Sequence, residues 1–224
     1  MERIPRHFSE ELEALQDRLL SMGGLAEERV REAVTGLTER DLDLIEHVLA
    51  GDTPINELHI DIDDRCFKLL ALRQPVAADL REIVAAVKAN TDLERVGDLA
   101  VNIAQAAMRA LQYPTPSAIS DIPKMSSIAQ RMLRDALDAF VRRDVFLARA
   151  VLAEDDALDA LKVDVSRDLL SYMRADPTSI DGCLQLILIS RHLERIGDHA
   201  TNIAEDVIFM VSALDVRHHP PNSV

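Results

Sequence analysis

A twelve-residue segment that occurs twice limits the folds open to this chain more than any other feature. Nine of the twelve positions are identical between 93–104 (LERVGDLAVNIA) and 193–204 (LERIGDHATNIA). The copies lie one hundred residues apart in a chain of 224, so the sequence predicts two similar halves. Within the first copy, Leu93, Val96 and Ala100 recur at intervals of three and four, which predicts one buried stripe on a helix.

Helical spacing of apolar residues extends through most of the chain, and no segment alternates convincingly as a strand. We expect helices at about 6–38, 41–73 with a break near Gly51–Pro54, 77–111, 121–141, 144–174 and 178–213. Only 3% of the residues are aromatic, and none is Trp, which suits helices packed through small aliphatic side chains. The sequence therefore predicts an elongated all-α protein of six long helices, arranged as two pseudo-symmetric antiparallel three-helix bundles.

The clearest linker is the segment Tyr113-Pro114-Thr115-Pro116-Ser117, which divides the chain near its middle. Residues on either side correspond at a constant offset of 103, as Asp41 does to Asp144. We predict a first three-helix repeat over 1–112, a linker over 113–118, a second repeat over 119–214 and a mobile tail over 215–224.

The overall charge narrows the classes of partner. With 25 basic and 39 acidic residues, the formal charge of −14 disfavours nucleic acid and anionic lipid as partners. No apolar run approaches the length of a membrane span, and residues 1–8 lack the apolar core of a signal peptide, so we expect a cytoplasmic protein without direct membrane insertion. Cys66 and Cys183 stand alone within helical patterns and are interpreted as core residues.

Oxygen-bearing side chains recur every four residues on a second face of each repeated segment. They are Glu94, Asp98 and Asn102 in the first copy and Glu194, Asp198 and Asn202 in the second. Residues four apart on a helix have Cβ atoms about 5–6 Å apart, so neighbouring carboxylates can share a hard cation. If the preceding helices pack antiparallel, Asp52 with Asn56 and Asp155 with Asp159 would face these stripes. A solvated acidic face remains the alternative, although solvation alone gives no reason to keep the pattern twice.

Other residues within the repeat leave two interpretations open. Mid-helix glycine costs about 1 kcal/mol relative to alanine, so Gly97 and Gly197 predict either a close helix crossing or a ligand near the backbone. Arg95 and Arg195 are expected to pair with the adjacent carboxylates. His192 and His199 replace Asp92 and Leu99 in the second copy, as extra ligands or as hydrogen-bonded surface histidines.

The sequence gives no support to catalysis. The Glu-x-x-His pattern of carboxylate-bridged di-iron bundles, the phosphate-binding glycine loop and the Gly-x-Ser-x-Gly nucleophile motif are all missing from it. A metal-dependent phosphohydrolase and a metal-free helical scaffold remain open as interpretations of the acidic motifs.

Together these motifs resemble those of the PhoU family, phosphate-signalling accessory proteins of bacteria. The segment 72–81 (LRQPVAADLR) is similar to the family's signature between helices 2 and 3, and both Glu-Arg-Val/Ile-Gly-Asp segments are similar to its acidic motifs. The resemblance implies two three-helix bundles in a cytoplasmic, non-enzymatic negative regulator. It also implies association with the ATPase of the phosphate ABC transporter and with a sensor histidine kinase. A homodimer is expected.

Some members of the family carry multinuclear metal clusters on the acidic motifs, which implies iron, manganese, magnesium or zinc as cofactors. Carried over by position, the metal ligands are Asp52, Asn56, Glu94, Asp98, Asn102, Asp155, Asp159, Glu194, Asp198 and Asn202. The signature segment makes Arg73, Gln74, Asp79 and Arg81 candidates for partner binding. Asn56 departs from the acidic pattern that Asp159 keeps, so the first site is expected to be the weaker of the two.

Overall fold

The computed structural model describes residues 6–51, 53–114 and 121–216. Its helices are α1 (Arg6–Glu39), α2 (Leu42–Ala50), α3 (Thr53–Arg73), α4 (Ala77–Ala110), α5 (Ile122–Arg142), α6 (Val145–Ala175), the short 3-10 helix η2 (Pro177–Ser179) and α7 (Ile180–Ser212). No strand occurs in these ranges, which confirms the all-α prediction. Asp52, most of the predicted linker and most of the predicted tail lie outside the described residues.

Local sequence explains where the helices begin and end. The side chain of Asp41 accepts hydrogen bonds from the backbone N–H groups of Asp43 and Leu44, and Asp144 caps α6 in the same way. The residue before each of these caps, Arg40 or Arg143, has a left-handed backbone, with φ of 57° and 54°. Both corners therefore repeat at the offset of 103 that the sequence predicted.

Glycine has different effects at two places in the first half of the chain. α1 runs through Gly23 and Gly24 without interruption, whereas α2 ends at Ala50 and α3 begins at Thr53. The predicted break near Gly51 is therefore confirmed, and it divides the second predicted helix into α2 and α3.

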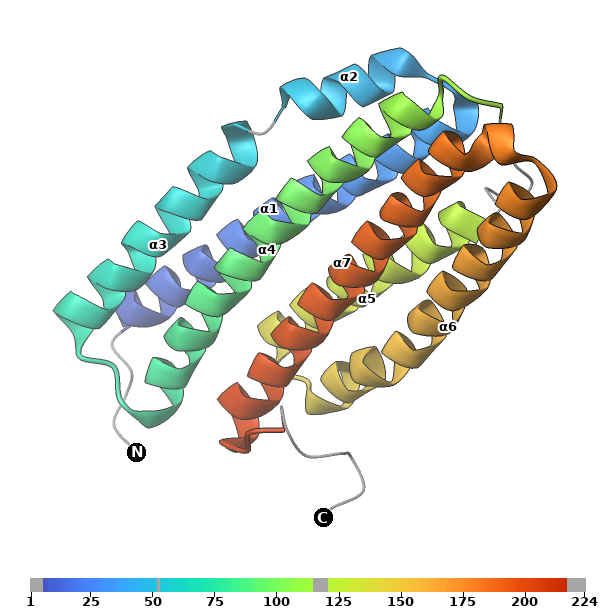
Figure 1. Ribbon diagram of the computed structural model, residues 1–224. Coiled ribbons are helices and arrows are strands. Elements are labelled where there is room, and N and C mark those ends of the chain that lie inside the picture. Colours follow the sequence, from blue (N-terminus) through green and yellow to red (C-terminus); the bar gives the residue numbers. More distant parts are fainter. Residues whose placement is uncertain (1–5, 52, 115–120, 217–224) are drawn as a thin grey trace.

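The two repeated segments form the centre of the molecule. α4 and α7 carry them, run antiparallel and pack directly against each other, as Figure 1 shows. α1 and α5 pack together beside this pair, while α3 and α6 lie at the two outer edges (Figure 1). At 1.5 Å per residue, the 34 residues of α4 make a helix about 50 Å long.

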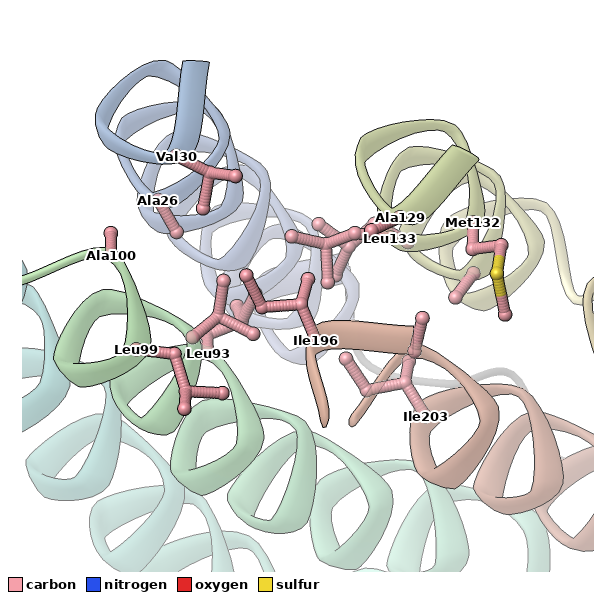
Figure 2. Packing of buried hydrophobic residues seen from close by; sticks show 14 of the residues in the cluster. Ala26, Val30, Leu93, Leu99, Ala100, Ala129, Met132, Leu133, Ile196 and Ile203 are labelled. Carbon is pink, nitrogen blue, oxygen red and sulfur yellow. The ribbon is translucent and has the colours of Figure 1, made fainter. Parts of the chain in front are cut away.

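One apolar core runs through both halves. Leu93 of α4 lies beside Ile196 of α7, Ala100 points toward Ala26 of α1, and side chains of α5 complete the cluster (Figure 2). The predicted stripe of Leu93, Val96, Ala100 and Ile103 is entirely buried, as are its counterparts on α7. Burying each large aliphatic side chain contributes about 1.5–3 kcal/mol, so packing between the halves is a major part of stability.

Cys66 and Cys183 are buried free thiols, as expected for core residues. Desolvation raises the pKa of Cys66 to about 12, with a further contribution from the charge of Asp63. Within the described residues, no helix combines the length and the apolar content needed to cross a membrane.

Candidate metal- and partner-binding surfaces

The second acidic set lies where α6 crosses α7. Gly197 permits this crossing, because a Cβ atom at that position would lie only 2.5 Å from Cδ2 of Leu158 and 3.5 Å from Oδ1 of Asp155. Ile55 of α3 approaches Gly97 of α4 in the same manner, with its Cδ1 3.0 Å from the corresponding position. The prediction of a close helix crossing at both glycines is therefore confirmed.

The crossing brings four carboxylates of the second half near one another: Asp155 and Asp159 from α6, and Glu194 and Asp198 from α7. Desolvation raises the pKa of Asp155 to about 6, and the negative charges of Asp198, Asp159, Asp156 and Glu194 add to this effect. Desolvation likewise raises the pKa of Asp198, as do Glu194 and Asp159, whereas His199 and Lys162 oppose the increase. The electrostatic cost indicates a cluster that favours a nearby positive charge.

A lysine of the same chain supplies such a charge. Nζ of Lys162 donates to Oε1 of Glu194 at 2.6 Å and to Oδ1 of Asp159 at 3.2 Å, so it joins α6 to α7. The hydrogen bond to Glu194 is the largest of the effects that raise the pKa of Lys162. The side chain of Lys162 is 26% exposed, so the ammonium contacts two carboxylates of the set and is also partly accessible to solvent.

The first acidic set pairs with its own arginine. Arg95 lies 3.0 Å from Oδ2 of Asp98 and 3.4 Å from Oε2 of Glu94, which confirms the expected salt bridges. Asn56 follows Ile55 at the start of α3, on the turn that contacts Gly97, whereas Asp52 lies outside the described residues. The same prediction is wrong for Arg195, the counterpart of Arg95, which forms no ion pair with any residue that the structure describes.

The asparagine at the end of the second motif contacts α4 instead of the carboxylates of its own set. Nδ2 of Asn202 donates to Oδ1 of Asp92 on α4 at 3.3 Å, and Nδ1 of His199 lies 2.7 Å from the same oxygen. Asn102 is exposed. His199 thus joins α7 to α4. His192 has a buried Nδ1 without a hydrogen-bond partner, and desolvation lowers its pKa, with Arg195 and Arg191 contributing.

The signature segment forms the corner between α3 and α4. Arg73 makes a bidentate ion pair with Glu11 of α1, at 2.8 and 2.9 Å, and Nε of Arg81 donates to the backbone oxygen of Met210 at 3.1 Å. Gln74 is exposed with a left-handed φ of 49°, and Asp79 lies in the first turn of α4. Both arginines therefore hold the fold together, and their role in partner binding stays a prediction.

Sequence reasoning missed two charged contacts. One is Lys162, which the repeat would have indicated, because Asp159 and Lys162 stand at offset 103 from the neutral pair Asn56 and His59. The other is Glu82, a buried carboxylate on α4 that accepts from Gln16 of α1 at 2.8 Å and pairs with Arg143 at the corner of α5 and α6. No periodicity would have indicated this second contact, since its residues come from α1, α4 and the corner between α5 and α6.

The donor sets differ in their fit to a metal ion. No group of three or more His, Cys, Asp and Glu side chains in the described ranges is arranged to hold one. In the second set, the ammonium of Lys162 lies between carboxylates where a cation would bind, so the set as built does not fit a metal. In the first set, the oxygen donors are of the type that a hard cation prefers, and the cation now paired with Glu94 and Asp98 is Arg95, whose side chain is 57% exposed.

Fold and site together define a class: duplicated all-α proteins whose two central helices carry matching acidic motifs. A PhoU domain family model matches residues 19–107 and 122–207. The phosphate-specific transport system accessory protein PhoU homolog of Pseudomonas putida is 43% identical over 96% of this chain and 84% of its own length. The accessory protein PhoU of Escherichia coli K12 is 33% identical over 96% of this chain and 89% of its own.

Solved structures agree with these sequence matches. The crystal structure of PhoU from Pseudomonas aeruginosa superposes with a TM-score of 0.88 at 41% identity, covering 92% of this chain and all of that one. That of the phosphate transport system regulatory protein PhoU from Streptococcus pneumoniae gives 0.86 at 28% identity, covering 93% and 99%. The chain belongs to the PhoU family.

Proposed function

We propose that this protein is a non-enzymatic, cytoplasmic negative regulator of phosphate uptake and signalling. In this proposal it is an adaptor between the ATPase of the phosphate ABC transporter and a sensor histidine kinase. Its relatives are named as accessory proteins of the phosphate-specific transport system, which supports the regulatory role. The observation that carries the proposal is the presence of one acidic set in each half, where α3 crosses α4 and where α6 crosses α7.

Charge explains how such surfaces would recognise a partner. The chain has a formal charge of −14, and carboxylates gather where α6 crosses α7 and on α4 beside its crossing with α3. A basic patch on the ATPase or the kinase would be attracted to this field, and the attraction would weaken as salt screens it. Binding through these surfaces is therefore expected to be salt-sensitive.

Capture of the transporter ATPase by immobilised protein tests the proposal. Glu94→Ala with Asp98→Ala is expected to reduce capture by at least about tenfold at low salt, since two charges at the contact are lost. Glu13→Ala with Asp17→Ala is the matched control, because these exposed carboxylates have the same spacing on α1. Equal capture by both double variants and the wild type would refute docking through the first acidic set.

We further propose that the first set, Glu94 and Asp98 with Asn56 and Asp52, binds iron, manganese, magnesium or zinc. The bound ion would reduce the negative charge presented to a partner. Elemental analysis of protein purified without chelator tests this part: the wild type is expected to retain metal, and the Glu94→Ala, Asp98→Ala variant to lose it. From the resemblance to the PhoU family we also propose that the protein forms a homodimer. Light scattering of the purified chain measures its oligomeric state.

A further inference from the structure

We propose that Lys162 is the resident cation of the second acidic set, so that this half of the protein uses a lysine where a metal ion would otherwise bind. The inference rests on the proposed function only in taking metal binding as the alternative state of such a set. It makes the two halves chemically different despite their common motif.

The contacts of Lys162 support this role directly. Its Nζ lies 2.6 Å from Glu194 on α7 and 3.2 Å from Asp159 on α6, one carboxylate from each side of the helix crossing. A cation bound between the two helices would need those same oxygens. An ammonium and a metal ion repel each other at such distances, so the set holds one or the other.

Comparison of the repeats shows that the lysine and its aspartate differ from the first half together. At offset 103, Asp159 replaces Asn56 and Lys162 replaces His59, so one negative and one positive charge are added three residues apart on α6. The formal charge of the set, counted with Asp155, Glu194 and Asp198, stays at −3, which equals that of Asp52, Glu94 and Asp98. This compensated change indicates that the added carboxylate and the added ammonium function as a pair.

His59, which corresponds to Lys162 in the first half, does not have the same role there. Its Nδ1 lies 3.4 Å from the backbone oxygen of Asn90 and its Nε2 lies 3.7 Å from Asp63, so the imidazole is turned toward those residues. Asn90 in turn donates to Asp63 and to the backbone oxygen of His59. Among the described residues, the carboxylates Glu94 and Asp98 pair with the exposed Arg95, and the guanidinium of Arg29 lies beside Gly51. Neither arginine is seen to join a carboxylate of α3 to one of α4, as Lys162 joins α6 to α7.

Titration of metal-stripped, full-length protein with Mn²⁺ tests the inference. All variants carry Glu94→Ala and Asp98→Ala, so that only the second set contributes. In this background Lys162→Gln is expected to increase the affinity for Mn²⁺ by at least about tenfold, because the competing charge is removed. Lys162→Arg keeps the positive charge and is expected to leave the affinity unchanged.

Two further measurements locate the effect. Paramagnetic broadening by Mn²⁺ of the amide signal of Gly197 is expected in Lys162→Gln and not in its parent, and adding Asp155→Asn should abolish it. Thermal melting is expected to show that Lys162→Gln lowers the melting temperature without metal and that Mn²⁺ restores it. Lys124→Gln is the control, since Lys124 on α5 makes an ion pair with Asp121, the residue immediately before that helix.

Equal Mn²⁺ affinity of the second set with and without Lys162, within about twofold, would overturn the inference whether both proteins bind the ion or neither does. This result is independent of the adaptor proposal, which is judged by capture of the ATPase with the first set intact. If the wild type failed to capture the ATPase, the adaptor proposal would be refuted and the lysine hypothesis would remain. If Lys162 had no effect on Mn²⁺ affinity, the lysine hypothesis would be refuted and the adaptor proposal would remain.

Discussion

Single residues of the second acidic set link its geometry to pH. Asp155 is the most perturbed carboxyl there, with a pKa raised from 3.8 to about 6 by desolvation and by its acidic neighbours. Its neutral form is favoured in the folded state. The contribution of this residue to stability is therefore fully present below about pH 4 and is lost as pH rises through 6.

Replacing Asp155 by Asn should remove this dependence. Below about pH 4 the variant is expected to match the wild type, and above pH 7 to be more stable by about 1 kcal/mol, less than the full linkage value because the carboxyl is partly exposed. Urea denaturation between pH 4 and 8 measures the difference. Asp168→Asn, an exposed site on the same helix, should follow the wild-type profile. A constant difference between Asp155→Asn and the wild type across this range would contradict the assignment.

Pairs of helices show why the motif contains glycine. At Gly197, α6 crosses α7 so closely that Leu158, itself fully buried, occupies the space of a Cβ atom. At Gly24, also within a helix, no atom lies within 4 Å of that position. The same substitution should therefore have opposite effects at the two sites.

Gly197→Ala is expected to destabilise the protein by about 1–2 kcal/mol, because overpacking outweighs the gain in helix propensity. Gly24→Ala is expected to stabilise it by about 0.5–1 kcal/mol, since only the propensity changes. Thermal or urea denaturation compares them. A stabilising Gly197→Ala would mean that the crossing of α6 and α7 is looser than described.

The helices themselves could be predicted well from the sequence, while their neighbours could not. An apolar stripe such as that of Leu93 and Val96 shows that a face is buried, but it does not identify the helix that covers it. The candidate site could be predicted only in part, for a related reason. Each step of four residues rotates a helical position by about 40°, so Asn202 lies roughly 80° from Glu194 and reaches Asp92 of α4 instead. Predicting the role of Lys162 would have required aligning the two repeats residue by residue, in addition to recognising their shared motif.

At the scale of the whole molecule, an ion pair between a buried carboxylate and a half-exposed arginine joins the two halves. Glu82 of α4 has a side chain only 3% exposed, while Arg143, at the corner between α5 and α6, is 52% exposed. Removing Arg143 leaves a buried carboxylate without its cation, whereas removing the charge of Glu82 leaves an arginine that water can solvate. The two losses are therefore unequal.

Arg143→Gln is expected to cost about 2–3 kcal/mol in the free energy of unfolding, and Glu82→Gln about 1 kcal/mol. Arg142→Gln, which removes only the exposed pair with Asp138, should cost less than about 0.5 kcal/mol. Urea denaturation at neutral pH measures all three. If Glu82→Gln were the costlier change, the pair would not act as a buried anchor between the halves.

The apolar interior that continues from one repeat into the other has a consequence for how long the protein survives. The buried cluster contains residues of both repeats, so opening one repeat would expose the apolar face of α4 or α7 in the other, and we expect neither repeat to be stable alone. Degradation in the cell should then follow a single global unfolding event, and the supply of active regulator would depend on that one equilibrium.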